Sequence, residues 1–481
     1  MRNRRTIALA ATAGALMAAA AAAVPAAPAA TKPEATAGAS TPKIIVTPGA
    51  LHLTKVFSSA PTTAECEADY QVACYSPEQL RDAYKLAPVY ASGITGKGET
   101  IVIVDSYGSP TIQNDLTVFD QTFGLNAPPS FKVVTPLGPI PWDPTANPDQ
   151  VGWAGETTLD VQAAHAIAPD ANIVLVESPV DETEGVTGFP QIEQAEEDVL
   201  NHPAEYGITG QIAVISQSFS ATEETFTGLQ QVEPLRASYK LAARDHVTVL
   251  TATGDSGAAD VGLDEETYYT YPVTSWPDSD PLVTGVGGTE VIDNDNHYSS
   301  TTWNDTYSTA VNEYIFGDAG PNPLAGGGGV SELFTRPAYQ DGVQPQYGNH
   351  RLVPDISMSA ACSGLYDNYE SFPAGTGIPN GWYPSCGTSE ATPLFSGIVA
   401  LAAQAAGHPL GLINRALYKL SAENAPGIVD ITRGNNTVTF TQGTPAVTTT
   451  VQGFNAEPGY DLATGVGTVD ARYFVDELAG N

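Results

Sequence analysis

Short apolar runs rich in β-branched residues recur along the chain, with segments of helical periodicity between them. The runs carry few polar residues on either face, which predicts strands buried on both sides of a sheet. They occupy 99–105, 172–178, 212–216, 246–253 and 281–289. Helices are predicted over 156–169, 189–202 and 232–246. This alternation predicts an α/β fold, with a doubly wound, mostly parallel sheet that has helices on both faces.

Residues that follow the predicted strands are the first candidates for chemistry, because such sheets bind ligands at the carboxyl ends of their strands. Asp105 ends the first strand, and Asp255 follows the fourth within Gly-Asp-Ser-Gly. A protonated Asp255 would donate a hydrogen bond to an oxyanion, in the way that an amide side chain does. The alternative reading of Asp255 is an ordinary aspartate turn.

A glycine–threonine–serine turn leads into a long apolar helix. Gly387 permits a close backbone approach, Ser389 falls where the helix begins, and Pro393 is expected in the first turn, where its missing N–H costs little. A helix N-terminus favours developing negative charge, so Ser389 is a candidate nucleophile. Its alternative role is that of a helix N-cap. Which role applies depends on whether the chain supplies a base.

The base is predicted to be a carboxyl rather than a histidine. None of the seven histidines stands in a His-Gly context, and His165 is expected to be a packed or surface residue of an alanine-rich helix. The i, i+4 spacing of Glu156 and Asp160 places both carboxyls on one helix face, where they can share a proton. Glu156 would accept the proton of Ser389 while Asp160 orients it. A solvated acidic face is the alternative for this pair.

Taken in order, three motifs resemble those of the sedolisin family of serine-carboxyl peptidases. They are Glu156-xxx-Asp160, Gly254-Asp255-Ser256-Gly257 and Gly387-Thr388-Ser389-xxx-Pro393. The resemblance covers nearly all of 75–475 and includes the segments 326–340 and 353–360. It implies a subtilisin-like fold over 71–481, with Glu156 as base, Asp160 as its partner, Asp255 in the oxyanion hole and Ser389 as nucleophile.

The same resemblance implies one structural Ca²⁺ ion in a C-terminal loop. The matching ligands are the carboxylates of Asp430 and Asp461 and the carbonyls of Ile431, Glu457 and Gly459. Hard oxygen ligands of this kind suit Ca²⁺. The spacing of two aspartates would not by itself indicate a metal, because such residues are usually surface residues.

The chain departs from the family pattern at several positions. Glu390 follows the nucleophile where a small residue is usual, Glu457 replaces a glycine of the calcium loop, and Ser220 replaces a glycine on the strand that pairs with substrate. The family also carries a large folded prodomain, whereas at most about forty residues separate the predicted signal peptide from the predicted catalytic region here. We therefore expect activation and substrate subsites to differ from those of the family.

The N-terminus predicts export. Three arginines, an alanine-rich apolar stretch and small residues mark 1–30 as a signal peptide. Residues 31–70 are poor in aromatic residues and predict a linker or short pro-segment. No other apolar run is long and uninterrupted enough to span a bilayer.

The predicted location is extracellular, where the four cysteines would form disulfides. Four cysteines allow three connectivities; the local pairs Cys66–Cys74 and Cys362–Cys386 are predicted.

The composition is strongly acidic. Asp and Glu number 54 against 19 Lys and Arg, for a formal net charge of −35. This charge makes nucleic acids and anionic membranes poor partners. It is also typical of adaptation to acid, although halophilic and highly soluble secreted proteins share it. We expect a monomer that acts on polypeptides.

These features together predict a secreted endopeptidase that is active in acid. A Glu base has an ordinary pKa of ~4.3, against ~6.5 for His, so cleavage is expected at roughly pH 3–5. Two alternatives remain: a tripeptidyl-peptidase of the same family, and a catalytically inactive secreted binding protein on the same scaffold. An esterase or lipase is disfavoured, because the chain lacks a placed His and the Gly-x-Ser-x-Gly elbow.

Overall fold

The computed structural model describes residues 51–52, 56–371, 376 and 378–481. The chain divides into the units Met1–Pro42 and Lys43–Asn481, and all described residues belong to the second. The predicted signal peptide 1–30 therefore lies outside the described residues, as does most of the predicted segment 31–70. The last residues of that segment form helix α1 (Thr63–Tyr70). No helix in the described ranges combines the length and apolarity that crossing a membrane requires.

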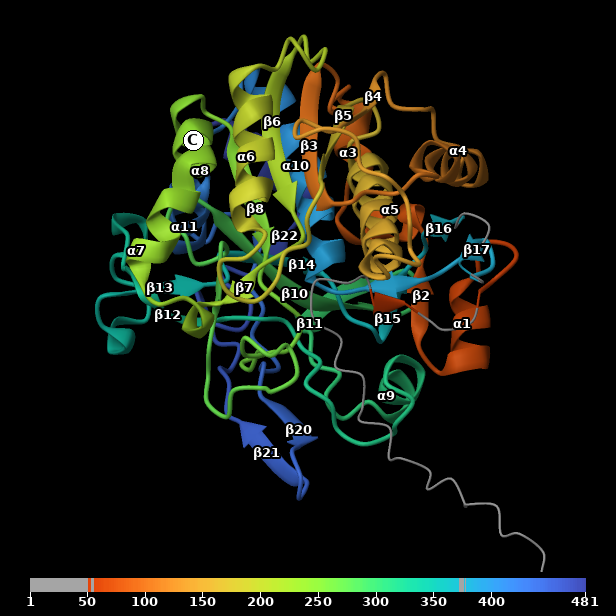
Figure 1. Ribbon diagram of the computed structural model, residues 1–481. Helices are drawn as coiled ribbons and strands as arrows, with labels where there is room; N and C mark the ends of the chain where they lie inside the picture. Colours follow the sequence, from red (N-terminus) through yellow and green to blue (C-terminus); the bar gives the residue numbers. More distant parts are fainter. Residues whose placement is uncertain (1–50, 53–55, 372–375, 377) are drawn as a thin grey trace, which may run out of the picture. The chain divides into compact units, whose positions relative to one another are not determined.

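A central sheet of eight strands organises the described part of the chain (Figure 1). Its path runs β11 (Tyr298–Thr302), β10 (Thr284–Asp293), β8 (Thr248–Ala252), β6 (Gln211–Gln217), β3 (Glu99–Ser106), β5 (Asn172–Ser178) and β4 (Phe131–Val134), and β14 (Ile356–Ser359) pairs with β10. Strand β11 is antiparallel to β10, and the other pairs of the sheet are parallel. The predicted α/β class and its mostly parallel sheet are confirmed.

Helices cover both faces of the sheet because the strands are apolar on both sides. On β3, Ile101 and Ile103 enter a core shared with α5 (Asp149–Ile167) and α10 (Thr388–Ala406). Val102 and Val104 point the other way, into a second core with α6 (Phe189–Asn201) and α8 (Ala237–Arg244). Alternate side chains of one strand thus serve two cores, as a doubly wound sheet requires.

Helix boundaries differ from the predicted ones at two places. Helix α5 begins at Asp149, before the predicted start at 156, so Glu156 lies in its interior rather than at its end. The predicted helix 232–246 is divided into α7 (Leu229–Val232), a 3₁₀ turn over Glu233–Arg236 and α8. Pro234 lies in that turn and lacks the N–H that a continuous α-helix needs.

The remaining elements surround the two cores. The remaining helices are α2 (Pro77–Ala83), α3 (Ala87–Ala91), α4 (Ile112–Phe123), α9 (Thr309–Ile315), α11 (Asn414–Ala422) and α12 (Ala471–Ala479). The short strands are β1 (Leu51–His52), β2 (Ala73–Tyr75), β7 (Ala221–Thr222), β9 (Ser275–Trp276), β12 (Gly329–Thr335), β13 (His350–Val353), β15 (Gly364–Tyr366), β16 (Tyr369–Glu370), β17 (Gly381–Trp382), β18 (Ser385–Cys386), β19 (Ile428–Val429), β20 (Val438–Gln442), β21 (Val447–Val451) and β22 (Thr468–Val469).

Both predicted disulfides are present. Cys66–Cys74 joins α1 to β2, and Cys362–Cys386 joins the segment after β14 to β18. All four cysteines of the sequence are thereby paired. Cys386 immediately precedes Gly387, so the second bridge ties the turn before α10 to the central sheet. The second bridge therefore holds the turn that leads to Ser389, the candidate nucleophile.

Candidate active site

The first turn of α10 presents Ser389. The helix begins at Thr388, and its N-cap Gly387 has φ 120°, a conformation that favours glycine. The Gly387 N–H donates to the carbonyl of Ala360 at 2.8 Å. A Cβ at Gly387 would lie 2.6 Å from Asp255 Oδ2, so the close approach of this carboxyl requires glycine. Ser389 is therefore the second residue of the helix and not its N-cap.

Pro393 lies deeper in α10 than predicted. It is the sixth residue of the helix, because the helix begins at Thr388, so the expectation of a first-turn proline was wrong. A proline at this position has no N–H to offer to the carbonyl of Ser389, one helical turn earlier. The backbone of the candidate nucleophile is therefore less tied to the helix than that of an ordinary helical residue.

Asp255 lies against the same turn. Its Oδ1 accepts the Thr388 N–H at 2.7 Å and the Thr388 hydroxyl at 2.8 Å. Burial raises the pKa of Asp255 to about 6, and the two hydrogen bonds from Thr388 oppose that rise. The structure thus brings Asp255 and Ser389 together, from the loop after β8 and the start of α10.

Glu156 and Asp160 are fully buried on α5, which excludes the solvated acidic face. Burial raises the pKa of Glu156, and the charges of Asp105 and Asp255 add to the rise. The Ser389 hydroxyl is near enough to lower that pKa, although neither Glu156 oxygen has a hydrogen-bond partner of good geometry. Asp160 Oδ1 accepts the Ser218 hydroxyl at 3.0 Å. Both predicted carboxyls therefore lie with Ser389 in one group.

Asp105 is a third member of this carboxyl group. It is fully buried near the end of β3, and burial raises its pKa. Its charge raises the pKa of both Glu156 and Asp160. Groups that interact this strongly lose their protons in successive steps, and the pKa values of those steps belong to the set rather than to any single carboxyl. The sequence offered one signal for Asp105, its position at the carboxyl end of a strand.

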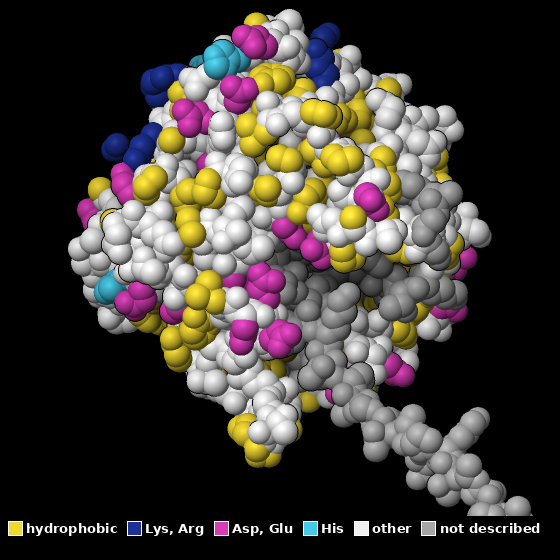
Figure 2. All heavy atoms as spheres, in the orientation of Figure 1, with side chains coloured by type: hydrophobic (Ala, Val, Ile, Leu, Met, Phe, Trp, Pro, Cys, Tyr) yellow, Lys and Arg dark blue, Asp and Glu magenta, His cyan; other side chains and the backbone are white. Residues whose placement is uncertain are grey.

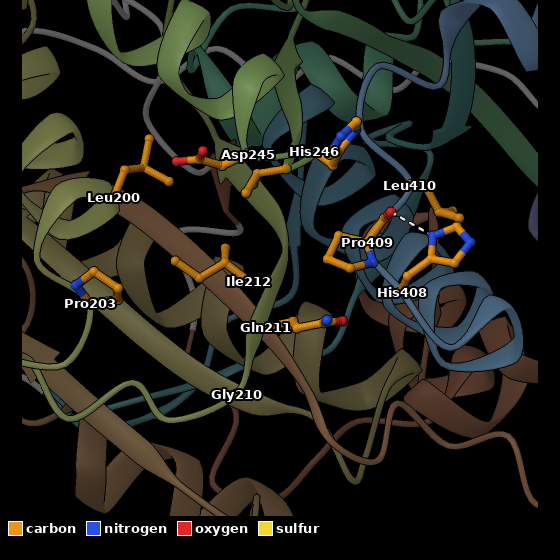
Figure 3. A pocket seen from close by; sticks show the side chains of 11 residues that line it. Leu200, Pro203, Gly210, Gln211, Ile212, Asp245, His246, His408, Pro409 and Leu410 are labelled. Atoms are coloured by element: carbon orange, nitrogen blue, oxygen red, sulfur yellow. Dashed lines mark hydrogen bonds between the residues drawn. The ribbon is translucent and has the colours of Figure 1, made fainter.

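His165 takes no part in this group. It is buried on α5, with Nε2 3.1 Å from Asp120 Oδ1 and 3.0 Å from the carbonyl of Asn126. The expectation of a packed histidine holds. A cavity of about 630 Å³ contains two others, His246 and His408, with apolar side chains from Leu200, Ile212 and Leu410 (Figure 3). This cavity lies at the starts of β6 and β8, the opposite edge of the sheet from Asp255.

Glu390, which replaces a small residue of the family, is fully buried behind the nucleophile turn. Neither carboxyl oxygen has a hydrogen-bond partner of good geometry. Burial raises its pKa well above the ordinary value, and the nearby Ser359 hydroxyl only partly opposes this. The side chain is thus a neutral acid over the acid pH range.

Replacing Glu390 by glutamine is expected to raise the melting temperature at pH 7 while changing it little at pH 4. As the pH rises, the unfolded chain releases the Glu390 proton before the folded chain does, and this lowers the free energy of unfolding. Glutamine has nearly the same shape and no proton to lose, so the variant is free of this loss. Melting curves of both proteins at the two pH values measure this difference. An equal shift at both pH values would contradict a titrating Glu390.

The predicted calcium ligands converge on one loop. Asp430 Oδ2 accepts the Gly459 N–H at 3.0 Å, and Asp461 Oδ2 accepts the Glu457 N–H at 2.9 Å. Ile431 is buried next to Asp430. The described residues contain no group of three or more His, Cys, Asp or Glu side chains arranged for a metal ion. The predicted ligand set has two carboxylates and otherwise carbonyls, and oxygen ligands of this kind fit Ca²⁺. The ion itself stays a prediction.

Residues 150–444 match the model of the subtilase family, Peptidase_S8. The match covers more than half of the chain, which therefore belongs to the subtilase family of serine-type peptidases. The resemblance to sedolisins is also confirmed. The chain is similar to kumamolisin of Bacillus sp. (strain MN-32), with 28% identity over 82% of this chain and 62% of that protein. It is 29% identical to tripeptidyl-peptidase 1 of Canis lupus familiaris over 49% of this chain and 38% of that protein.

The chain thus spans less than two thirds of the length of these relatives. Among solved structures it resembles Pseudomonas sedolisin, a serine-carboxyl proteinase, with a TM-score of 0.64 and 23% identity. That superposition covers 85% of this chain and 98% of the sedolisin chain. The subtilisin-like fold implied by the sequence motifs is confirmed.

Proposed function

We propose that the protein is a secreted serine-carboxyl endopeptidase that hydrolyses polypeptides through an acyl-enzyme on Ser389. The observation that carries this proposal is the grouping of Ser389 with Glu156 and Asp255 at the start of α10. Membership of a family of serine-type peptidases supports it. The Glu156 carboxyl is near the Ser389 hydroxyl, which supports it as the base.

The reaction begins when Ser389 Oγ attacks the peptide carbonyl and its proton passes to Glu156. Asp160 orients Glu156 from the next turn of α5. Because Thr388 binds Asp255 Oδ1, the proton of Asp255 is on Oδ2 and is donated to the oxyanion. Glu156 then gives its proton to the leaving amine, and a water molecule hydrolyses the acyl-enzyme by the same steps in reverse order.

This chemistry works in acid. Asp255 must keep its proton, and its pKa of about 6 sets the limit above which activity falls. Glu156 must lose its proton while Asp105 and Asp160 keep theirs. Burial raises the pKa of Glu156 to about 8, so the ordinary Glu pKa behind the expected range of about pH 3–5 does not apply to this buried side chain, and mutual repulsion among the carboxyls opposes more than one charge. The hydroxyls of Ser389 and Ser218 favour that charge on Glu156.

The partners and location of this proposal follow from the surface and the N-terminus. Asp and Glu side chains are scattered over the face shown in Figure 2, and its few Lys and Arg gather near the upper rim. Such a surface disfavours nucleic acid. The predicted signal peptide and the two disulfides support secretion.

One structural Ca²⁺ is part of the proposal, held by Asp430 and Asp461 with the carbonyls of Ile431, Glu457 and Gly459. Chelation is expected to lower the melting temperature, because an ion that binds only the folded chain stabilises it. Melting curves with EDTA, and with EDTA plus excess Ca²⁺, measure the effect. An Asp461→Asn variant should lose the response. No shift in the wild-type protein would remove these residues as calcium ligands.

Mapping of cleavage products distinguishes the proposed endopeptidase from its alternatives. The purified protein is incubated with a denatured protein at pH 4, and the products are identified by mass spectrometry. Internal fragments of varied length support the endopeptidase. Successive release of tripeptides from N-termini would instead favour the tripeptidyl-peptidase alternative, the activity for which these relatives are named. A folded protein that leaves the substrate intact at every pH would favour the non-catalytic binding protein.

A further inference from the structure

The base and the nucleophile of the proposed site lie on elements that are far apart in the sequence. Glu156 is in the interior of α5, whereas Ser389 lies three residues after the end of β18. The segment 366–370 contains the last residue of β15 and all of β16. Its residues form hydrogen bonds to both α5 and β18. The segment 366–370 therefore connects the two halves of the site.

Gln162 and Gly155 make the contact between this segment and α5. Gln162 is fully buried, and its Nε2 donates to the Tyr369 carbonyl at 2.8 Å while its Oε1 accepts the Tyr369 N–H at 2.9 Å. One side chain of α5 thus holds both backbone groups of a residue in β16, which lies beside the helix (Figure 1). A Cβ at Gly155 would lie 3.6 Å from both carboxyl oxygens of Glu370. The Glu370 carboxyl therefore packs against the helix backbone directly before Glu156.

Asn368 joins the same segment to β18. Its Oδ1 accepts the Ser385 hydroxyl at 2.7 Å, and its carbonyl accepts the Tyr383 N–H at 2.9 Å. The Asn368 Nδ2 donates to Glu370 Oε1 at 2.9 Å. Asn368, Ser385 and Glu370 are all buried, so these hydrogen bonds lie in a medium of low dielectric, where they are stronger than in water. A buried hydrogen-bonded connection thus runs from the helix of the base to the strand before the nucleophile turn.

We propose that Asn368 is a positioning residue for catalysis, which fixes the separation of the Glu156 carboxyl and the Ser389 hydroxyl. It does so by tying β18 to the segment that Gln162 holds on α5. Asn368 acts through Ser385 and takes no part in proton transfer. A displacement of about 1 Å between reacting groups can cost about 100-fold in rate, so a small movement of β18 matters. This inference rests on the proposed function, because it concerns the same base and nucleophile.

Removal of the Asn368 side chain tests the inference. In the Asn368→Ala variant, the Ser385 hydroxyl keeps only its contact with the Tyr383 carbonyl, so β18 is no longer tied to the segment 366–370 through this side chain. We expect kcat on a defined peptide at pH 4 to fall by about 10- to 100-fold, with KM changed by less than about twofold. Covalent labelling of Ser389 by a fluorophosphonate should slow by a similar factor, because it needs the same activated hydroxyl.

Two further variants separate positioning from a loss of stability. Burial beside Glu370 favours the protonated acid in Asn368→Asp, which then offers one donor and one acceptor in the shape of the amide. This variant should keep most of the wild-type kcat at pH 4. The control is Asn312→Ala, which removes an equally buried amide on α9. There the Asn312 Nδ2 donates to the Thr306 carbonyl at 3.0 Å, and its Oδ1 accepts from Asn322 at 3.1 Å. The control should lower the melting temperature but leave kcat and KM at wild-type values.

The outcomes separate this inference from the proposed function. A folded Asn368→Ala protein with a kcat within about twofold of the wild-type value would overturn the role of Asn368. An equal fall in kcat in the Asn312→Ala control would also overturn it, because the effect would then come from lost stability. If Asn368→Ala does not fold, Ser385→Ala breaks the same hydrogen bond from the other side and must show the same fall in kcat. A wild-type protein without Ser389-dependent cleavage would instead refute the proposed function.

Discussion

Replacing Ser389 by alanine is expected to reduce kcat/KM by a factor of about 10⁴ to 10⁶, the range that loss of a serine nucleophile produces in triad peptidases. In the proposed mechanism the Oγ atom forms the acyl bond, and the neighbouring carboxyls do not replace it. Substrate affinity and melting temperature should change little, because the Ser389 side chain is small and its removal leaves the Thr388–Asp255 contacts in place. Steady-state kinetics on a fluorogenic peptide at pH 4 measures this loss.

Ser396→Ala is a matched control for that variant. Ser396 is buried in the same helix, but its hydroxyl donates to the carbonyl of Pro393 and lies two turns away from Ser389. The control should keep most of its activity. Equal residual cleavage by the wild-type and Ser389→Ala proteins would identify a contaminant as the peptidase and favour the binding-protein alternative.

The free energy of unfolding is expected to fall steeply between about pH 4.5 and pH 8. Burial raises the pKa values of Asp255 and Asp305 to about 6 and that of Glu177 to about 8. In the unfolded chain these groups ionise near pH 4, so above that pH the unfolded state binds fewer protons than the folded state. Stability must then decrease as the pH rises through the folded pKa values. It is greatest in acid, where both states hold the protons.

The size of this effect is large. Keeping one such carboxyl neutral up to pH 6 costs about 3 kcal/mol, at 1.4 kcal/mol for each pH unit. Several carboxyls together approach the stability of an ordinary domain, about 5–15 kcal/mol. The net charge of −35 adds repulsion in the same direction. Melting temperatures from pH 4 to pH 8 should therefore drop by on the order of 10 °C or more.

The Asp305→Asn variant tests, at a single buried carboxyl, the expected loss of stability with rising pH. Asp305 Oδ2 accepts the Trp303 indole N–H at 2.8 Å and the Ser363 N–H at 3.1 Å, and an asparagine oxygen can accept both. In acid, the variant should have the melting temperature of the wild-type protein. Between pH 4 and pH 7 its melting temperature should fall less than that of the wild-type protein. A melting temperature that rises from pH 4 to pH 7 would contradict neutral buried carboxyls.

The strands and the placement of the candidate site residues were predictable because their signals are local. Each buried strand is a short apolar run, and each site motif lies next to one strand or helix. The i, i+4 spacing of Glu156 and Asp160 fixes their common face whatever the rest of the chain does. Ser389 needed only the glycine before it and the apolar helix after it. These residues therefore appeared at the expected places.

What the sequence did not reveal depends on pairing between distant segments. The position of Glu177 opposite Asp105 is known only once β5 lies beside β3 in a defined register. Thr388 gains its role from Asp255, which is far away in sequence. The early start of α5 at Asp149 was missed because its first two turns contain two glycines, Gly152 and Gly155, which are poor helix formers. Strand register arises from the whole fold and leaves no local pattern.

The central claim is that carboxyls rather than a histidine activate Ser389. The pH dependence of kcat/KM for one defined peptide, measured from pH 2 to pH 9 on the wild-type protein, tests it most directly. The account predicts an optimum in acid and a fall above about pH 6, where Asp255 loses its proton. A profile that rises through pH 6 to 7 and stays high at pH 8 would indicate a histidine base and contradict the account.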